Sequence, residues 1–313
     1  MKLVGAFIKM IRLPNLFFIV LTQLLFHVAI LDKILLPIGA RPVIDGLNFI
    51  LLSVASVLIA AAGYIINDYF DINIDQVNKP KGNVVDTVVA RRWAMAWHFI
   101  LSGIGLLLSV YISWRTGLWY ILLGNFGCVL LLFGYSVSLK RKLLFGNIVI
   151  ALLTAWVILI ICFSEIKIAL QVSPEIAEAS NKIIRIGILY AAFAFISTLI
   201  REAIKDIEDM QGDAKYGCRT MPIVWGVNAT KVYVAVWLVV ILALLVVLQV
   251  YVFRFSWWIA MAYSIVFIIA PFVLIFFKLF KATIQDHYHR LSNRTKLVML
   301  SGILSMIFFY FYL

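Results

Sequence analysis

The sequence predicts an all-α, polytopic membrane protein in which nine transmembrane helices surround a central cavity. Three observations support this fold class: the mean hydropathy of the 313-residue chain is +1.05, 64% of its residues are hydrophobic, and only 13% are charged. This composition excludes an ordinary soluble domain, because such a chain partitions into lipid. In lipid the backbone must satisfy its hydrogen bonds within each segment, so the long apolar runs predict helices.

Each long apolar stretch is predicted to form one span, because about 20 apolar residues in a helix cross the hydrocarbon core. The stretches cover residues 14–36, 44–66, 93–113, 117–138, 144–164, 183–204, 230–251, 256–279 and 297–313. The first stretch lacks a small-residue cleavage site and many others follow it. It is therefore predicted to be a retained span and not a signal peptide.

The basic residues predict the orientation of the chain in the membrane. Most of the 27 lysines and arginines lie in five alternate segments between spans, residues 1–13, 67–92, 140–142, 201–231 and 278–296. Cytoplasmic loops are enriched in Lys and Arg, so these segments are predicted to be cytoplasmic, with the N-terminus inside and the C-terminus outside. The net charge of +12 then reflects topology and attraction to anionic headgroups or substrates, and we expect no nucleic-acid partner.

One acidic pattern, Asp-x-x-Asp-x-x-x-Asp, occurs twice, each time after a long apolar run. The two copies consist of Asp68, Asp71 and Asp75, and of Asp206, Asp209 and Asp213. Positions i, i+3 and i+7 share one face of a helix, so each copy is predicted to project three carboxylates in one direction. Six like charges at a bilayer edge are costly unless cations neutralise them. Two such clusters suit a site for a divalent metal and a phosphorylated substrate.

The spacing of the two copies predicts an internal repeat. They are separated by four predicted spans, and an even number of spans keeps the helix direction the same. Both copies are therefore predicted to lie at the cytoplasmic side, within two parallel four-helix units followed by a ninth helix. We expect one integral-membrane domain over residues 1–313, with halves at 1–143 and 144–296 and the ninth helix at 297–313.

Basic and amide side chains accompany both acidic copies. Magnesium prefers oxygen ligands and is usually held by a few carboxylates together with substrate phosphates, while Lys and Arg bind the remaining phosphate oxygens. The candidate substrate-binding residues beside the two copies are Asn67, Lys79, Arg201, Lys205 and Arg219. Solvated charges that only fix topology would explain a single copy, but two matched copies favour a functional site. Glu202 and Glu208 are equally explained as helical pairs of neighbouring cations.

Two further polar segments are explained by membrane topology when they are taken alone. Tyr135, Lys140 and Arg141 close the fourth span, where any cytoplasmic loop is basic. Arg12 and Asn15 flank a proline at the start of the first span. Their assignment to a substrate site depends on a comparison of motifs.

These motifs resemble the UbiA-type superfamily of intramembrane prenyltransferases over the whole chain. The family pattern Asn-Asp-x-x-Asp-x-x-x-Asp matches residues 67–75, and the second family pattern matches residues 206–213. The pair Tyr135 and Lys140 is similar to the Tyr-to-Lys element between the fourth and fifth helices. Lys140 follows Tyr135 by five positions, whereas a spacing of four is common in the family. Arg141 is therefore an alternative to Lys140 as a ligand of the diphosphate.

Arg12 and Asn15 match the Arg-x-x-Asn element that the family has in its first helix. The resemblance implies an enzyme that transfers a prenyl group from a magnesium-bound prenyl diphosphate to a lipophilic acceptor within the bilayer. It implies that the six aspartates are the catalytic, Mg²⁺-holding residues and that the basic, tyrosine and asparagine candidates bind substrate.

The acceptor is suggested by the run from Lys205 to Pro222, which is similar to family members that alkylate geranylgeranylglyceryl phosphate. This similarity favours a geranylgeranyl donor and that acceptor, with an aromatic quinone precursor as the alternative. A cation-coupled transporter is the alternative from another class. Carboxylates of transporters usually lie near the middle of the membrane at broken helices, whereas these aspartates are predicted to lie at its edge.

Overall fold

The computed structural model describes residues 2–78, 85–165 and 174–313. These residues are almost entirely helical, and apart from one isolated bridge between Val85 and Val89 they contain no β-structure. In the described part of the chain, 9 helical segments are long and apolar enough to cross a membrane. The predicted fold class, an all-α polytopic membrane protein, is confirmed.

The spanning segments follow one another with short connections. The first five are α2 (Leu13–Phe26) extended by α3 (Asp32–Leu35), α4 (Gly46–Phe70), α6 (Arg91–Thr116), α7 (Trp119–Val137) and α8 (Phe145–Cys162). The last four are α10 (Pro174–Lys215), α12 (Val227–Phe253), α13 (Trp258–Ser264) with α14 (Ala270–Lys281), and α15 (Gln285–Leu304) with α16 (Ile307–Tyr312). Three short helices lie outside the spans: α1 (Lys2–Met10), α5 (Ile72–Asn78) and α11 (Met221–Val224).

Two spans are longer than their apolar stretches predicted. The helix α10 continues to Lys215, and α15 begins at Gln285, so most of the expected loops at 201–231 and 278–296 are helical. Hydropathy marks where a helix enters lipid and not where it ends. These polar extensions remain helical because each buries apolar residues in a shared core, Ile204 and Ile207 from α10 and Tyr288 and Leu291 from α15.

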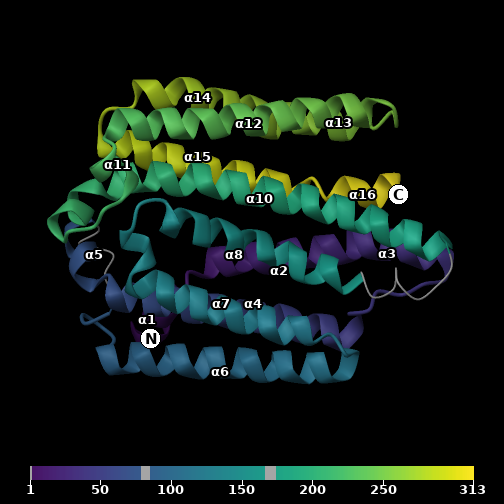
Figure 1. Cartoon of the computed structure of the whole chain (residues 1–313), viewed down its shortest axis with the longest axis horizontal. Helices are drawn as coiled ribbons and strands as arrows, with labels where there is room; N and C mark the ends of the chain where they lie inside the picture. Colours follow the sequence, from purple (N-terminus) through teal and green to yellow (C-terminus); the bar gives the residue numbers. More distant parts are fainter. Residues whose placement is uncertain (1, 79–84, 166–173) are drawn as a thin grey trace.

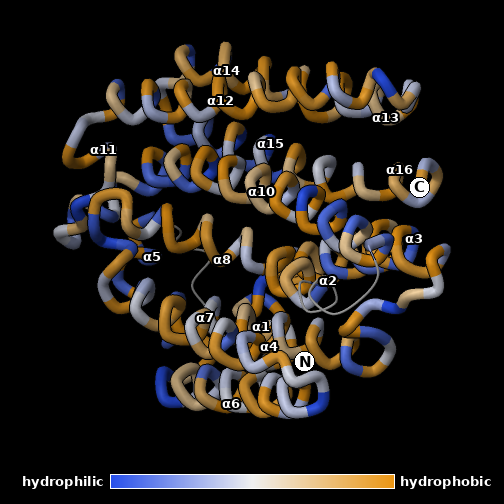
Figure 2. The backbone as a smooth tube through the Cα atoms, turned by 45° about the vertical axis from the view of Figure 1, so that its right-hand side comes forward, coloured by the Kyte–Doolittle hydropathy of each residue, from blue (hydrophilic) through white to orange (hydrophobic). Residues whose placement is uncertain are grey.

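The spans lie side by side along the long axis of the molecule (Figure 1). The helix α4 leads into α5 and α10 leads to α11 at the same end, which is on the left of that view. Both acidic copies therefore lie at one end of the bundle, as the alternation of spans predicted. Figure 2 shows hydrophobic residues along most of the spans and hydrophilic residues around α5.

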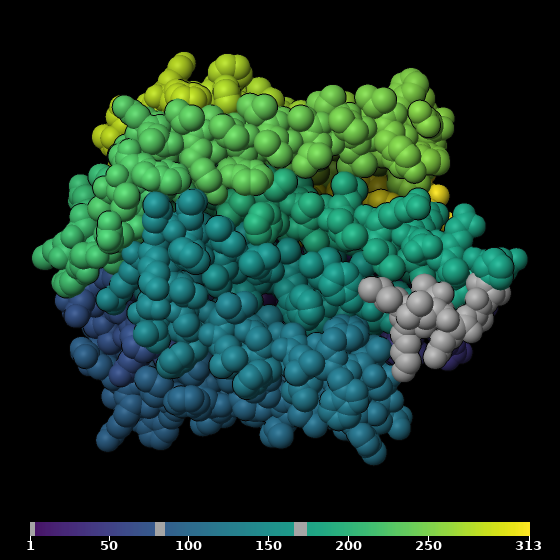
Figure 3. All heavy atoms as spheres, viewed as in Figure 1, coloured from purple at the N-terminus to yellow at the C-terminus, as the bar shows by residue number. Residues whose placement is uncertain are grey.

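Helix packing forms a ring around an interior space. The helix α2 packs against α4, α8 and α15, while α10 packs against α8, α12 and α15, and α4 also contacts α6 and α7. The helices α6, α12 and α14 cover the outside of this ring. The helix α12 lies on the face shown in Figure 3. Its side chains include Val236 and Val247, which are 55% and 66% exposed. An apolar outer surface of this kind suits contact with lipid.

Small residues permit the closest approach between spans. A Cβ added to Gly187 on α10 would stand 2.4 Å from the sulfur of Cys162 on α8 and 3.3 Å from the ring of Phe26 on α2. A Cβ on Gly124 of α7 would stand 2.1 Å from Trp156 of α8. Without a hydrophobic driving force between helices in lipid, such close contacts hold a membrane bundle together.

The variant Gly187→Leu is expected to lower the thermal unfolding temperature of the detergent-solubilised protein. Overpacking of a filled interface costs about 1–3 kcal/mol. The matched control is Gly103→Leu on α6, where an added Cβ meets nothing within 4 Å. Equal unfolding temperatures for the two variants would contradict the proposed role of this contact.

Candidate active site

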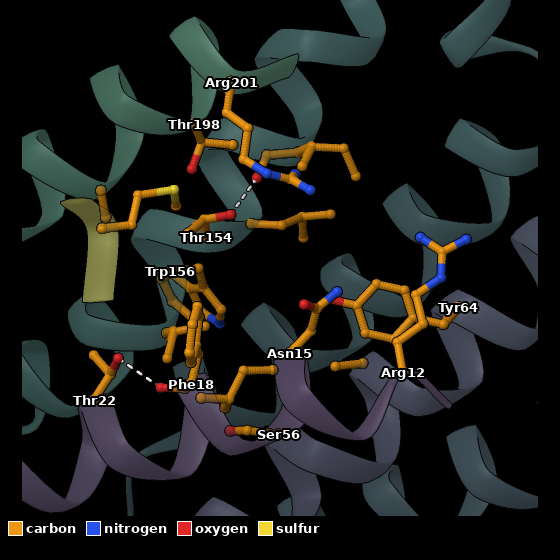
Figure 4. Close-up of a pocket in the computed structure, with 18 of the residues that line it drawn as sticks. Arg12, Asn15, Phe18, Thr22, Ser56, Tyr64, Thr154, Trp156, Thr198 and Arg201 are labelled. Carbon is orange, nitrogen blue, oxygen red and sulfur yellow. Dashed lines mark hydrogen bonds between the residues drawn. The ribbon is translucent and has the colours of Figure 1, made fainter. Parts of the chain in front are cut away.

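A cavity of about 570 Å³ lies between α2, α4, α7, α8, α10 and α15. This volume falls within the range of roughly 300–1,000 Å³ that is typical of small-molecule sites. Figure 4 shows Arg12 and Asn15 on one side of the cavity and Thr198 and Arg201 of α10 on another. Charged lining residues such as Asp68, Asp75 and Arg201 lie toward the α5 end of the cavity.

The cavity changes from charged to apolar along its length. On α4 the lining residues run from Ser56 to Asp68 toward α5, and on α15 they run from Lys296 to Ile303 away from it. The hydroxyls of Thr22 and Thr154 line the apolar part but donate to backbone oxygens of their own helices, at 2.7 and 2.8 Å (Figure 4). The far part of the cavity is therefore suited to a hydrocarbon chain.

The first acidic copy is anchored by a cation from the break before α2. Arg12, the N-cap of α2, has a left-handed backbone with φ of 52°. One of its Nη atoms donates to Oδ1 of Asp68 at 2.7 Å, and its guanidinium lies 5.1 Å from the centre of the Tyr64 ring. A non-glycine residue in this conformation costs of order 1–3 kcal/mol, so surrounding contacts must hold Arg12 there.

Asp71 lies at the boundary between α4 and α5 and contacts two of the predicted residues. Its Oδ2 accepts a hydrogen bond from Nδ2 of Asn67 at 2.9 Å, and its Oδ1 is 2.5 Å from Nζ of Lys140. Lys140 also donates to Oδ1 of Asn67 at 3.2 Å. Burial lowers the pKa of the Lys140 ammonium below its usual value, although the Asp71 carboxylate acts in the opposite direction.

The helix break at Asp71 divides the first acidic copy between two helices. Asp68 and Asp75 line the cavity, whereas Asp71 is directed toward Lys140. The prediction that all three carboxylates of this copy share one helix face is therefore wrong. The predicted periodicity assumed one continuous helix, but the backbone at Asp71 is not helical.

The second acidic copy lies on the uninterrupted helix α10. Oδ2 of Asp206 accepts a hydrogen bond from Nδ2 of Asn147 at 3.0 Å, and Arg201 forms an ion pair with Glu202. Asp213 lies within electrostatic range of Asp71 of the first copy. The two copies thus meet at the α5 end of the bundle.

One asparagine of α5 joins the two acidic copies. Nδ2 of Asn78 donates to the backbone oxygen of Asp209 at 3.0 Å, and its Oδ1 accepts from the backbone N–H of Gly212 at 2.9 Å. A Cβ on Gly212 would stand 2.4 Å from that same oxygen, so only glycine allows the side chain to lie this close. Asn78 was not among the predicted site residues, because its partners are distant in the sequence.

The predicted residues fall into three groups. Those that line the cavity are Arg12, Asn15, Asn67, Asp68, Asp75, Tyr135, Arg201 and Lys205. Those of the described residues that are not part of its lining are Asp71, Asp206, Asp209, Asp213, Lys140, Arg141 and Arg219. The backbone N–H of Arg219 donates to the carbonyl of Arg141 at 2.8 Å. Lys79 lies outside the described residues.

Among the described residues, the candidate metal ligands do not form one cluster. Among residues 2–78, 85–165 and 174–313, no cluster of three or more His, Cys, Asp or Glu side chains is placed to hold an ion. The individual carboxylates instead contact Arg12, Lys140 and Asn147.

Sequence reasoning missed Lys296, which lines the cavity from α15. Its Nζ donates to Oδ1 of Asn15 at 2.5 Å and lies 5.3 Å from the centre of the Phe18 ring. No pattern in the sequence indicated this position, because a lysine beside a span is fully explained by membrane orientation.

A second cavity, of about 130 Å³, lies between α10, α12, α13 and α15. It shares Tyr190, Phe193 and Gly302 with the first cavity. The hydroxyl of Tyr190 is 2.8 Å from that of Ser305, and a Cβ on Gly302 would stand 2.2 Å from the Phe193 ring. Two aromatic side chains therefore stand in the wall between the cavities.

The variant Asn78→Leu is expected to detach α5 from α10, because it removes both hydrogen bonds that join them. Spin labels at the exposed positions Gln76 and Gln211 would report the separation by pulsed electron resonance, with a longer or broader distance distribution in the variant. The matched control is Asn73→Leu, an exposed position on the same helix. An unchanged distribution for Asn78→Leu would show that other contacts hold α5.

Comparison with known proteins identifies the family. The family model described as the UbiA prenyltransferase family matches residues 34–309. The chain is 30% identical over 260 residues to the digeranylgeranylglyceryl phosphate synthase of Methanosphaera stadtmanae, across 82% of this chain and 86% of that protein.

Solved structures share the fold. One, described as "Structural and mechanistic insights into the biosynthesis of Digeranylgeranylglyceryl phosphate synthase in membranes", has a TM-score of 0.63 and 21% identity and covers 98% of this chain and 99% of that one. A UbiA homolog from Archaeoglobus fulgidus bound to GPP and Mg²⁺ has a TM-score of 0.55 and 14% identity, covering 96% and 99%. The family match spans most of the chain, so this integral membrane protein belongs to the UbiA prenyltransferase family and is an enzyme of the prenyltransferase class.

Proposed function

We propose that this enzyme transfers a geranylgeranyl group from its Mg²⁺-bound diphosphate to geranylgeranylglyceryl phosphate. One observation carries the proposal: two acidic copies meet at the charged end of a cavity whose other end is apolar. A prenyl diphosphate has the same division, with a charged head and a hydrocarbon chain. The head would lie at the aspartates and the chain would extend between the spans.

The side chains at the charged end suit magnesium. Aspartate oxygens are hard ligands, and Mg²⁺ is commonly held by one or two carboxylates together with substrate phosphate oxygens and water. We assign the ligand role to the six motif aspartates, of which Asp68 and Asp75 line the cavity. When bound, Mg²⁺ would stabilise the negative charge of the departing diphosphate.

The neighbouring cations are assigned to the diphosphate. Arg12 and Lys140 pair with Asp68 and Asp71, at 2.7 and 2.5 Å, so they neutralise these carboxylates before substrate binds. Binding of a metal to the carboxylates would free both cations for phosphate oxygens, to which Lys and Arg donate strong hydrogen bonds. The remaining proposed substrate-binding residues are Asn15, Asn67, Lys79, Tyr135, Arg141, Arg201, Lys205 and Arg219.

The apolar part of the cavity would hold the reacting carbon away from water. The bond between C1 of the prenyl group and the diphosphate oxygen breaks, and the electron pair leaves with the diphosphate. A hydroxyl of the acceptor then forms the new C–O bond and releases its proton. The rings of Phe18 and Trp156 line the cavity, and aromatic faces stabilise positive charge.

The acceptor and the orientation are supported by sequence. The curated relative from Methanosphaera stadtmanae is named for digeranylgeranylglyceryl phosphate synthesis, and the similarity covers most of both chains. The concentration of Lys and Arg in alternate connecting segments supports a cytoplasmic position for the charged end.

The variants Asp71→Ala and Asp209→Ala are expected to reduce magnesium-dependent prenyl transfer by on the order of 10²–10³, as for a lost charge-stabilising group. Turnover is measured as release of diphosphate by the purified protein. The control is Asp286→Ala, since the Asp286 side chain is 53% exposed and pairs only with Arg290 one turn away. Wild-type turnover in either motif variant would refute the assignment of these aspartates.

The substrates are tested by supplying labelled geranylgeranyl diphosphate, Mg²⁺ and a set of acceptors. We expect an ether-linked product with geranylgeranylglyceryl phosphate and none when Mg²⁺ is chelated. A product formed only with an aromatic quinone precursor would replace the proposed acceptor. No diphosphate release with any acceptor would contradict prenyl transfer and favour a transporter.

A further inference from the structure

Lys296 of α15 lies beside the last apolar stretch, and none of the roles assigned above uses its ammonium group. It lines the cavity from α15, where it donates to the amide oxygen of Asn15 at 2.5 Å and lies over the ring of Phe18 at 5.3 Å. Membrane orientation accounts for a lysine at this edge, but a cation that lines the cavity is also placed to meet an anionic substrate. The amide of Asn15 supplies no opposite charge.

Two further cations surround the same part of the cavity. Arg201 of α10 and Arg12 at the start of α2 line the same cavity as Lys296. Arg12 pairs with Asp68 and Arg201 with Glu202. The Nε atom of Arg201 is buried and has no hydrogen-bond partner among the described residues. This donor and the ammonium of Lys296 can therefore both serve an anion that enters the cavity.

The cations of this group and the first acidic copy come from different helices. Lys296 and Arg201 belong to α15 and α10, and Asn15 belongs to α2; α15 packs against both α10 and α2. Asp68 and Asp75 belong to α4 and α5. Arg12, at the start of α2, pairs with Asp68.

We propose that Lys296, Arg201 and Asn15 form a second anion subsite, which binds the phosphate group of a phosphorylated lipid acceptor. The inference rests on the proposed function and names a part of the acceptor site that the aspartates do not provide. A phosphate monoester has several acceptor oxygens and suits one guanidinium together with one ammonium. From Lys296 the lining residues of α15 continue through Met299 to Ile303, along which the isoprenoid chain of the acceptor would lie.

The first test is kinetic and uses Lys296→Met. Methionine removes the charge and keeps an unbranched side chain against Phe18. Loss of one charge-assisted hydrogen bond is expected to raise the KM for geranylgeranylglyceryl phosphate about tenfold to a hundredfold. The KM for geranylgeranyl diphosphate is expected to change by less than about twofold. Lys296→Arg should recover much of the acceptor affinity.

The second test measures binding without turnover. Labelled geranylgeranylglyceryl phosphate is bound to the purified protein without donor, and unlabelled geranylgeranylglycerol, which lacks the phosphate, competes. The wild type is expected to prefer the phosphorylated lipid, and Lys296→Met is expected to lose that preference. The control is Lys278→Met, an exposed lysine of α14, which should behave as the wild type does.

The outcomes separate the subsite from the proposed function. If the wild type transfers a prenyl group to the phosphorylated acceptor but Lys296→Met keeps its preference, the subsite is refuted and the function stands. If the donor KM rises in place of the acceptor KM, Lys296 belongs to the diphosphate site and the inference is overturned. If the wild type binds no phosphorylated lipid, the proposed acceptor and the subsite are both refuted.

Discussion

The mutual repulsion of carboxylates at one end of a lipid-embedded bundle is the constraint on which the rest of the structure depends. The motif aspartates lie where water is limited and like charges are poorly screened. The protein balances them individually, with Arg12 on Asp68, Lys140 on Asp71 and the amide of Asn147 on Asp206. Each of these partners, two cations and one amide, comes from a different element, so the contacts hold the ends of several helices in place.

The same charge balance explains the local irregularities of the backbone. Arg12 adopts a left-handed conformation in the break between α1 and α2, where its guanidinium reaches Asp68. The helix α4 ends at Asp71, which brings this carboxylate to Lys140. The helix α10 has no such break, and Asn78 holds it to α5 through two hydrogen bonds. Irregular backbone therefore occurs on the first acidic copy, and a regular helix carries the second.

The sequence predicted the features that have short-range or compositional signals. Apolar stretches located the spans, and the spacing of Asp68 and Asp206 placed both acidic copies at one end of the bundle. The ends of α10 and α15 were not predictable in this way, since hydropathy reports contact with lipid and not helix termination. Neither Asn78 nor Lys296 had a signal, because their partners Gly212 and Asn15 are far away in the sequence.

The wall between the two cavities limits the space that is available to a bound hydrocarbon chain. It includes the side chain of Tyr190 and that of Phe193, whose ring the backbone of Gly302 approaches closely, and it separates spaces of about 570 and 130 Å³. Smaller side chains at these two positions would enlarge the space beside the first cavity. The charged end lies elsewhere in the bundle, so such a change would alter the room for a bound hydrocarbon chain and leave the motif aspartates unchanged.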